Sequence, residues 1–214
     1  MRKQIVTDVL FFLQVGCVMI FAIPQFRYML TSNKGVSITW YSFGEAFATM
    51  LFLIAFSDHR AQPSRNTRQR LTMYSLWIAA IGSHMAVMFI RHTAAWDKND
   101  SIASVAGSVG IIVTLAIARA LKLPISDPMV LGWLTLSFKG VIQLILVPKV
   151  YLLGGAGLVL WTILVPNASS VIRIGHLYSS VLKEGWTRAR RGLLVGEVAN
   201  EGSWLVVTVA WLLS

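Results

Sequence analysis

Long apolar segments follow one another along almost the whole chain, and they restrict the fold more than any other feature. A helix needs about 20 predominantly apolar residues to cross the hydrocarbon core of a bilayer. Seven segments meet this requirement: 5–30, 36–56, 71–90, 102–121, 129–153, 155–182 and 193–213. Their apolar residues are continuous rather than alternating, so we expect helices and not the strands of a membrane barrel. The sequence therefore predicts an all-α membrane protein with seven transmembrane helices.

The composition supports this class and excludes others. Charged residues make up 13% of the 214 residues, whereas a soluble domain carries about 25%. The net charge of +10 lies in short basic clusters between apolar segments, and no polar segment is long enough to form a nucleic-acid-binding domain. Cys17 is the single cysteine, which excludes an internal disulfide and a cysteine-based metal site. We find no metal-spaced histidines, activated nucleophile or phosphate-binding loop, so we expect neither an enzyme nor a bound cofactor or metal.

The basic residues predict the orientation in the membrane. Eleven Lys or Arg residues lie on the face that carries the N-terminus, against four at most on the other face. By the positive-inside rule we expect a cytoplasmic N-terminus and an external C-terminus. The first apolar segment lacks a small-x-small cleavage site, which indicates an uncleaved first helix. Short loops and the lack of tails indicate a multi-pass protein of a bacterial-type inner (plasma) membrane.

The first three segments and the last three share one plan. The first helix of each half carries a late proline, Pro24 or Pro148, and a glycine-containing turn follows it. The second helix carries an early tryptophan, Trp40 or Trp161, and an Arg-rich loop precedes the third helix. A single helix between two such units gives the second unit the orientation of the first, as in transporters with parallel repeats.

We therefore expect a 3+1+3 arrangement, in which two parallel three-helix bundles are joined by a linker helix. The first bundle is expected at residues 1–92, the linker helix with its flanking loops at 93–128, and the second bundle at 129–214.

The residues around Pro24 resemble a known repeat. Ile23-Pro24-Gln25, Lys34 and Gly35-Val36-Ser37 follow one another in the order and spacing of the PQ-loop repeat. In that repeat a helix ends in Pro-Gln, a short loop carries a lysine, and Gly-x-Ser opens the next helix. The segment 16–57 resembles this repeat. The second half departs from it, because Pro148-Lys149 replaces Pro-Gln and the Gly-x-Ser continuation is missing.

The 3+1+3 plan resembles the seven-helix family of the SWEET sugar transporters, the cystinosin-like exporters, the nicotinamide riboside transporters and the KDEL receptor. The cytoplasmic N-terminus expected here is opposite to that of eukaryotic SWEETs. The resemblance implies a hinge at Pro24, Gln25 and Pro148 that lets each bundle rock. Proline kinks a helix and frees carbonyl groups, and glutamine can hydrogen-bond to such groups. The alternative is that Pro24 only ends its helix near the membrane interface.

Ionisable residues deep within the apolar segments are candidate site residues, because they are costly in a membrane. Glu45 and Lys139 lie about ten residues into segments of different halves, and hence near mid-membrane. We expect them to face each other or a shared cavity, either as a gate or as a structural ion pair. For His84 we expect a neutral ring bound to a backbone carbonyl, with a proton relay as the alternative. Lys149 is near a segment end, where its side chain can reach the interface.

The sixth segment carries a polar face. Asn167, Ser170 and Arg173 are spaced by three residues and share this face, which must point into the bundle. Asn200 lies in a similar cluster of the last segment, for which a solvated vestibule or a charge cluster is the alternative. Aromatic rings with amides suit a small polar solute. The candidate substrate-binding or gating residues are therefore Glu45, Lys139, Asn167, Ser170, Arg173, Trp161, Trp40, His84 and Asn200.

For the two tryptophans, an interfacial aromatic belt is the alternative.

The sequence favours a membrane carrier of a small polar solute (a sugar, an amino acid or a vitamin precursor) that works by alternating access of its two bundles. A cargo or ligand receptor of the KDEL-receptor type is the first alternative, and an accessory membrane protein is the second. The expected partners are the solute and the lipid bilayer, with a homo-oligomer as a further option and no nucleic acid.

Overall fold

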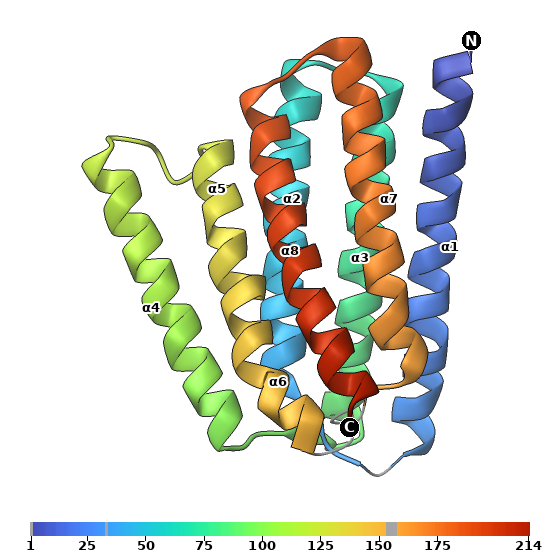
Figure 1. Cartoon of the computed structure of the whole chain (residues 1–214), viewed down its shortest axis with the longest axis vertical. Coiled ribbons are helices and arrows are strands. Elements are labelled where there is room, and N and C mark those ends of the chain that lie inside the picture. Colours follow the sequence, from blue (N-terminus) through green and yellow to red (C-terminus); the bar gives the residue numbers. More distant parts are fainter. Residues whose placement is uncertain (1, 33, 153–157) are drawn as a thin grey trace.

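The computed structural model is a bundle of long helices (Figure 1), and it describes residues 2–32, 34–152 and 158–214. Its helices are α1 (Arg2–Thr31), α2 (Ile38–Ala61), α3 (Arg65–Ile90), α4 (Lys98–Ala120), α5 (Pro128–Thr135), α6 (Ile142–Leu152), α7 (Leu160–Glu184) and α8 (Arg188–Leu212). A π-helical turn, η1 (Leu136–Val141), joins α5 to α6, so that the three form one continuous rod. The glycine-containing turn expected at 154–157 lies outside the described residues.

Six helical segments among the described residues are long and apolar enough to cross a membrane: α1, α2, α3, α4, the α5–α6 rod and α8. Large apolar side chains such as Phe12, Ile112 and Leu212 are exposed on the bundle, as lipid contact requires. The protein is thus a multi-pass membrane protein. The seventh expected span, α7, has 25 residues but is not among the six. Polar residues in the middle of α7, such as Asn167, Arg173 and His176, lower its hydropathy.

Polar capping residues begin several helices and extend them beyond the apolar segments. Ser64 and Asp97 start α3 and α4 with capping boxes, in which each side chain accepts from a backbone N–H one turn later. Asp127 caps α5, with proline in the first turn. Gly185, with φ of 79°, ends α7 in a conformation that favours glycine. Helix α3 therefore begins before residue 71, where its apolar segment starts.

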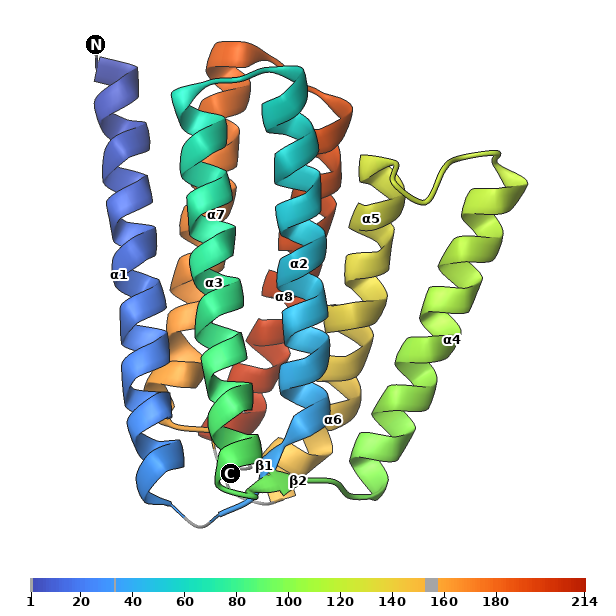
Figure 2. The ribbon, with the colours of Figure 1, turned by 180° about the vertical axis from the view of Figure 1, so that it is seen from behind.

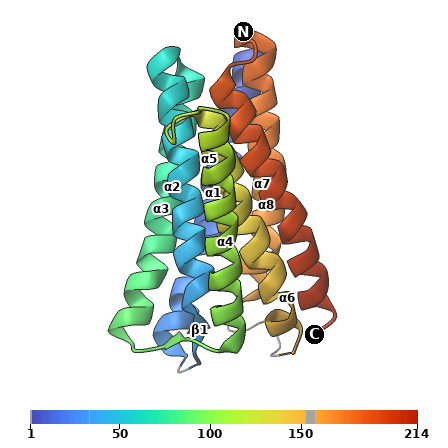
Figure 3. The ribbon, with the colours of Figure 1, turned by 90° about the vertical axis from the view of Figure 1, so that its left-hand side faces the viewer.

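The helices pack in two groups. Helix α3 packs against both α1 and α2, and α8 packs against both α7 and the α5–α6 rod (Figures 1 and 2). Between the groups, α1 lies against α7, and α2 lies against α5 and α8. Figure 3 shows α2 and α3 on one side of the bundle and α7 and α8 on the other. Helix α4 lies at the edge, mainly against η1 and α6.

The two ends of the bundle carry different connections. At the upper end in Figure 1, α1 begins, α2 connects to α3, and α7 connects to α8; α8 ends at the lower end. There β1 (Val36–Ser37) pairs in parallel with β2 (Ala94–Ala95), a short ladder that the sequence analysis did not predict. Both strands belong to loops that the helix ends bring side by side. Pro24 lies inside α1, which ends at Thr31, so residues 26–30 continue the helix after the proline.

Candidate functional site

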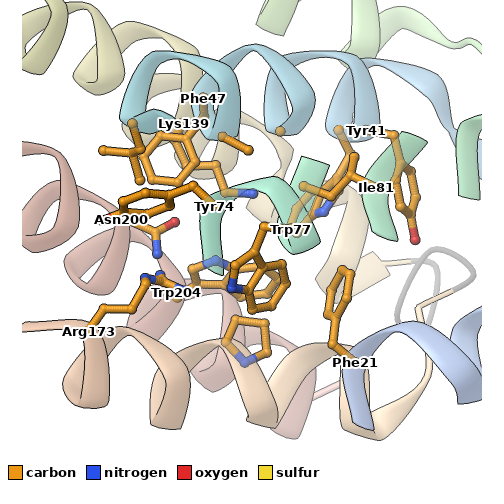
Figure 4. A pocket seen from close by; sticks show the side chains of 15 residues that line it. Phe21, Tyr41, Phe47, Tyr74, Trp77, Ile81, Lys139, Arg173, Asn200 and Trp204 are labelled. Carbon is orange, nitrogen blue, oxygen red and sulfur yellow. The ribbon is translucent and has the colours of Figure 1, made fainter. Parts of the chain in front are cut away.

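A pocket lies between the two groups of helices, at the middle of the bundle. Its volume is about 40 Å³, more than the roughly 10–15 Å³ that one water molecule needs. Residues of α1, α2, α3, η1, α7 and α8 line it, and Figure 4 shows their side chains pointing into the shared space. Its aromatic lining consists of Phe21, Trp40, Tyr41, Phe47, Tyr74, Trp77 and Trp204. Two cations, Lys139 and Arg173, and one amide, Asn200, also line it, and no carboxylate does among the described residues.

Lys139 enters the pocket from the π-helical turn η1 and is buried. Its Nζ lies 5.6 Å, 5.9 Å and 5.1 Å from the ring centroids of Trp40, Phe47 and Trp204. Across the described residues, no carboxylate lies within ion-pair distance of this nitrogen. A lysine at mid-membrane costs about 2.5–3.5 kcal/mol on insertion scales, and a desolvated cation–π contact returns about 2 kcal/mol. The rings therefore offset part of the cost, and no carboxylate among the described residues offsets the rest.

The π-helical turn itself is an unusual local structure. Such turns are rare, and they occur frequently at functional sites. A π-helical turn shifts the face that the following residues present, and here it places both Lys139 and Gln143 toward α8. The oxygen of the Gln143 amide, and not its nitrogen, is assigned to the side that faces two donors. In this orientation the oxygen accepts from Lys139 Nζ at 3.2 Å and from Trp204 Nε1 at 3.1 Å. Gln143 is thus the polar contact that the protein gives to Lys139.

Arg173 differs from Lys139, because its charge is balanced by a carboxylate, that of Glu197. Its Nε donates to both carboxylate oxygens of Glu197, at 2.8 Å each. Its Nη1 donates to Ser169 Oγ at 2.7 Å and its Nη2 to Ser170 Oγ at 2.9 Å. Tyr74 also donates to Glu197, at 2.8 Å. Arg173 and Glu197 thus form a buried, hydrogen-bonded ion pair that supports one side of the pocket.

Three further polar groups that line the pocket are buried without a hydrogen-bond partner among the described residues. They are Asn200 Oδ1, Trp77 Nε1 and Tyr41 Oη. The Asn200 amide is held in place from its other end, where Nδ2 donates to Ser170 Oγ at 2.8 Å. A buried polar group without a partner costs about 1–3 kcal/mol, and most such groups find one. All three residues line one pocket, and each keeps a buried polar atom that has no partner among the described residues.

Glu45 does not lie where the sequence analysis placed it. It does not line the pocket, and it forms no ion pair with Lys139. The reason is the helical phase of α2, in which Gly44 faces Lys139 and the next residue points elsewhere. A Cβ atom built on Gly44 would lie 3.6 Å from Lys139 Nζ, and one on Gly82 of α3 would lie 3.6 Å from Glu45 Oε1. Glu45 therefore faces α3, within its own group of helices.

Of the remaining predicted residues, some line the pocket and others do not. Trp40 lines the pocket, whereas the side chain of Trp161 is exposed, as an interfacial belt requires. Ser170 does not line the pocket but binds two residues that do, Arg173 and Asn200. Asn167 lies away from the pocket, where its Nδ2 donates to Thr208 Oγ1 at 2.7 Å and to a backbone carbonyl.

The expected contact of His84 with a backbone carbonyl is confirmed. Its Nε2 lies 3.0 Å from the carbonyl oxygen of Ala22, close to the proline of α1. The ring packs against two pocket residues, Phe21 and Tyr41, at centroid distances of 5.4 Å and 5.6 Å. His84 itself is not among the residues that line the pocket.

The predicted hinge residue Gln25 connects the two halves of the chain. It is fully buried, and its Oε1 accepts from Val159 N at 3.1 Å and from Thr162 Oγ1 at 2.8 Å. Val159 is the N-cap residue of α7, so Gln25 of α1 caps the start of a helix in the other group. The glutamine after Pro24 thus joins α1 to α7 at the lower end.

The second proline motif makes an analogous contact with different chemistry. Lys149 Nζ lies 2.5 Å from Asp100 Oδ2 and 3.1 Å from Asp97 Oδ2. Asp100 accepts from Ser37 Oγ at 2.5 Å, and Ser37 is the N-cap residue of α2. Lys149 is buried, and the carboxylates that it contacts lie at the start of α4. We call Gln25, Thr162, Lys149, Asp97, Asp100 and Ser37 the lower contacts.

A larger polar network lies at the upper end and joins α2 and α3 to α7 and α8. Asp58 forms ion pairs with two buried guanidinium groups, those of Arg70 and Arg190. Arg190 also pairs with Glu184 at 2.5 Å, and Arg70 donates to Ser180 Oγ at 2.8 Å. Thr187 donates to Asp58 Oδ1 at 3.0 Å. We call Asp58, Arg70, Ser180, Glu184, Thr187 and Arg190 the upper network.

Sequence reasoning missed the upper network and most of the aromatic lining of the pocket, including Tyr41 and Trp77. One feature of the sequence could have identified Asp58, since it is a carboxylate in the last turn of an apolar helix.

The chain matches no family model, no curated protein and no solved structure in comparisons with each. The resemblance to the PQ-loop repeat therefore rests on the sequence pattern of residues 16–57.

Proposed function

We propose that the protein is a membrane carrier of a small polar solute, and that it works by alternating access of two three-helix bundles. The single observation that carries this proposal is the central pocket between the two groups of helices. It holds a buried lysine that has no carboxylate partner in the part of the chain that the structure describes. Carriers with repeated bundles bind their solutes near the bilayer midplane, at the interface of the repeats.

Helix packing supports the 3+1+3 arrangement. If α1 is matched with the α5–α6 rod, α2 with α7, and α3 with α8, then the contacts of one group reproduce those of the other. The contact of α1 with α7 corresponds to that of the α5–α6 rod with α2. One departure is the contact of α2 with α8, which has no counterpart of similar extent between α7 and α3. Helix α4 takes the place of the linker.

In this proposal α7 is the seventh span. It runs beside α1 and α8 (Figure 1), two helices that are apolar enough to cross a membrane. Many of its polar side chains, including Ser169, Ser170 and Arg173, are buried within the bundle rather than exposed to lipid. A polar helix is stable at membrane depth when its polar face points inward.

The lower contacts and the upper network are the proposed gates. Both connect one group of helices to the other, and the pocket lies between them along α2, α3, α7 and α8. Alternating access requires each set of contacts to break in turn, while the kinks at Pro24 and Pro148 let the bundles tilt. For the orientation, the basic loops favour a cytoplasmic upper end in a bacterial-type inner membrane.

Uptake into proteoliposomes tests this function. Purified protein is reconstituted and screened with radiolabelled sugars, amino acids and vitamin precursors. Gly44→Leu places a side chain in the pocket beside Lys139 and is expected to abolish uptake. Gly202→Leu is the matched control, because a side chain there meets open space, and it is expected to retain uptake.

Three outcomes of this assay separate the candidate functions. Uptake that Gly44→Leu abolishes supports the carrier. Solute binding without uptake supports the receptor alternative. Uptake that is equal in the wild type and in Gly44→Leu contradicts a pathway through this pocket.

A further inference from the structure

We propose that the pocket binds a small hydroxycarboxylate, and that Lys139 binds its carboxylate group. This inference concerns the pocket of the proposed carrier and rests on that function for its biological meaning, but the binding site itself stands on the geometry below.

The two cations of the pocket differ in their partners. Arg173 has a carboxylate partner in Glu197, and two serine hydroxyls accept its remaining contacts. Lys139 has aromatic rings and one amide oxygen around its Nζ. An ammonium group has three N–H donors, and Gln143 accepts one of them. Lys139 is thus the pocket cation whose charge no carboxylate balances among the described residues, and an anionic group is the partner that matches this charge.

The unpartnered polar groups of the pocket residues are mainly hydrogen-bond donors. Trp77 Nε1 is a donor, and Tyr41 Oη can donate as well as accept. Asn200 Oδ1 can only accept. All three line the same pocket as Lys139 and are buried without a partner among the residues that the structure describes. Donors therefore outnumber acceptors, which selects a solute with several acceptor oxygens and at least one O–H or N–H donor.

The charge of the pocket favours a hydroxyl over an amine as the donor group of the solute. An ammonium group on the solute would approach Lys139 and Arg173, and no carboxylate lines the pocket among the described residues to offset this repulsion. A neutral hydroxyl group donates to Asn200 Oδ1 without that cost. The rings of Trp40, Trp77 and Trp204 provide flat apolar surfaces for the carbon skeleton. A hydroxycarboxylate therefore fits the pocket better than an amino acid or a neutral sugar.

The test measures binding by the full-length protein in lipid nanodiscs, through the fluorescence of its tryptophans. The probes are matched pairs that differ in charge but not in shape: lactate with lactamide, and glycolate with glycolamide. We expect the carboxylate of at least one pair to bind about tenfold or more tightly than its amide, as a charge-assisted hydrogen bond provides. Lys139→Gln is expected to remove this preference, Lys139→Arg to retain it, and the exposed control Lys122→Gln to leave it unchanged.

Two results would overturn the inference: no preference for either carboxylate in the wild type, or a preference that survives Lys139→Gln. If Lys139→Gln does not fold, Lys139→Met takes its place, and a preference that survives Lys139→Met overturns the inference. The outcome is separable from that of the carrier proposal. A Lys139-dependent preference in a protein without uptake leaves the anion site standing and refutes the carrier. Equal uptake of neutral solutes by the wild type and by Lys139→Gln would support the carrier and refute the anion site.

Discussion

Replacing Asp58 by asparagine tests the upper network most sharply, because this carboxylate is the shared partner of two buried cations. The side chain of Asp58 is fully buried, as is that of Arg190, and that of Arg70 is 2% exposed. In Asp58→Asn, Arg190 keeps Glu184 as a partner, whereas Arg70 keeps only the hydroxyl of Ser180. Removing one partner of a buried pair costs about 3–5 kcal/mol. We expect the free energy of unfolding to fall by about this amount.

The assay is reversible unfolding of the purified protein in mixed micelles by titration with sodium dodecyl sulfate. The control is Arg188→Gln, which breaks the ion pair with Asp127 on a side chain that is 55% exposed, and should cost about 0–1 kcal/mol. In the double variant Asp58→Asn with Arg70→Met, part of the loss should be recovered, because the unpaired guanidinium is gone. A loss below about 1 kcal/mol for Asp58→Asn would refute the view that this ion pair holds the upper end closed.

Three other substitutions test separate parts of the structure in the same unfolding assay. Lys139→Met should leave the free energy of unfolding unchanged or raise it, because it removes a buried cation without leaving a carboxylate unpaired. A loss of about 3 kcal/mol or more would contradict this and indicate that Lys139 has an anionic partner. Gly192→Ala should lower it by about 1–3 kcal/mol, since a Cβ atom there would meet the carbonyl group of Pro128, whereas Gly202→Ala meets nothing and should be neutral or stabilising. At Asp127, burial acts to raise the pKa, but hydrogen bonds from Arg188 and the Met129 backbone, with the charge of Arg188, lower it overall. Because the folded pKa lies below the unfolded value of about 3.9, the charge of Asp127 stabilises the protein above that value, and this contribution is lost as the pH falls through the folded pKa. Asp127→Asn should therefore be less stable than wild type at neutral pH and equal to it below the folded pKa, and a difference that persists there would contradict this assignment.

The positions of the helices could be predicted from hydropathy, because an apolar run of fixed length is a direct requirement of the bilayer. The helix ends could not, because caps such as Ser64 lie outside the apolar runs. Helix α7 shows the limit of the same signal. Its polar residues, which identify it as part of the pocket, also remove it from the helices that hydropathy supports as spans.

The site was predicted in part. Lys139 was found because a cation in an apolar segment is conspicuous, but its partner was wrongly predicted, since residues 44 and 45 of α2 point in different directions. The π-helical turn that aims Lys139 leaves no sequence signal that we can identify. The upper network was missed because Asp58 and Arg190 are far apart in the chain, and only the packing of α2 against α8 brings them together.

Access to the pocket from both sides of the membrane is the central claim, and cysteine labelling measures it directly. The natural cysteine is first replaced by Cys17→Ser, and Ala48→Cys then places one thiol in the pocket. A membrane-impermeant thiol reagent is applied to right-side-out and inside-out vesicles. Lys34→Cys and Lys122→Cys, at exposed positions near opposite ends of the bundle, report each face alone. The carrier account predicts that the thiol introduced by Ala48→Cys reacts from both faces. Reaction from one face only, or from neither, would contradict it.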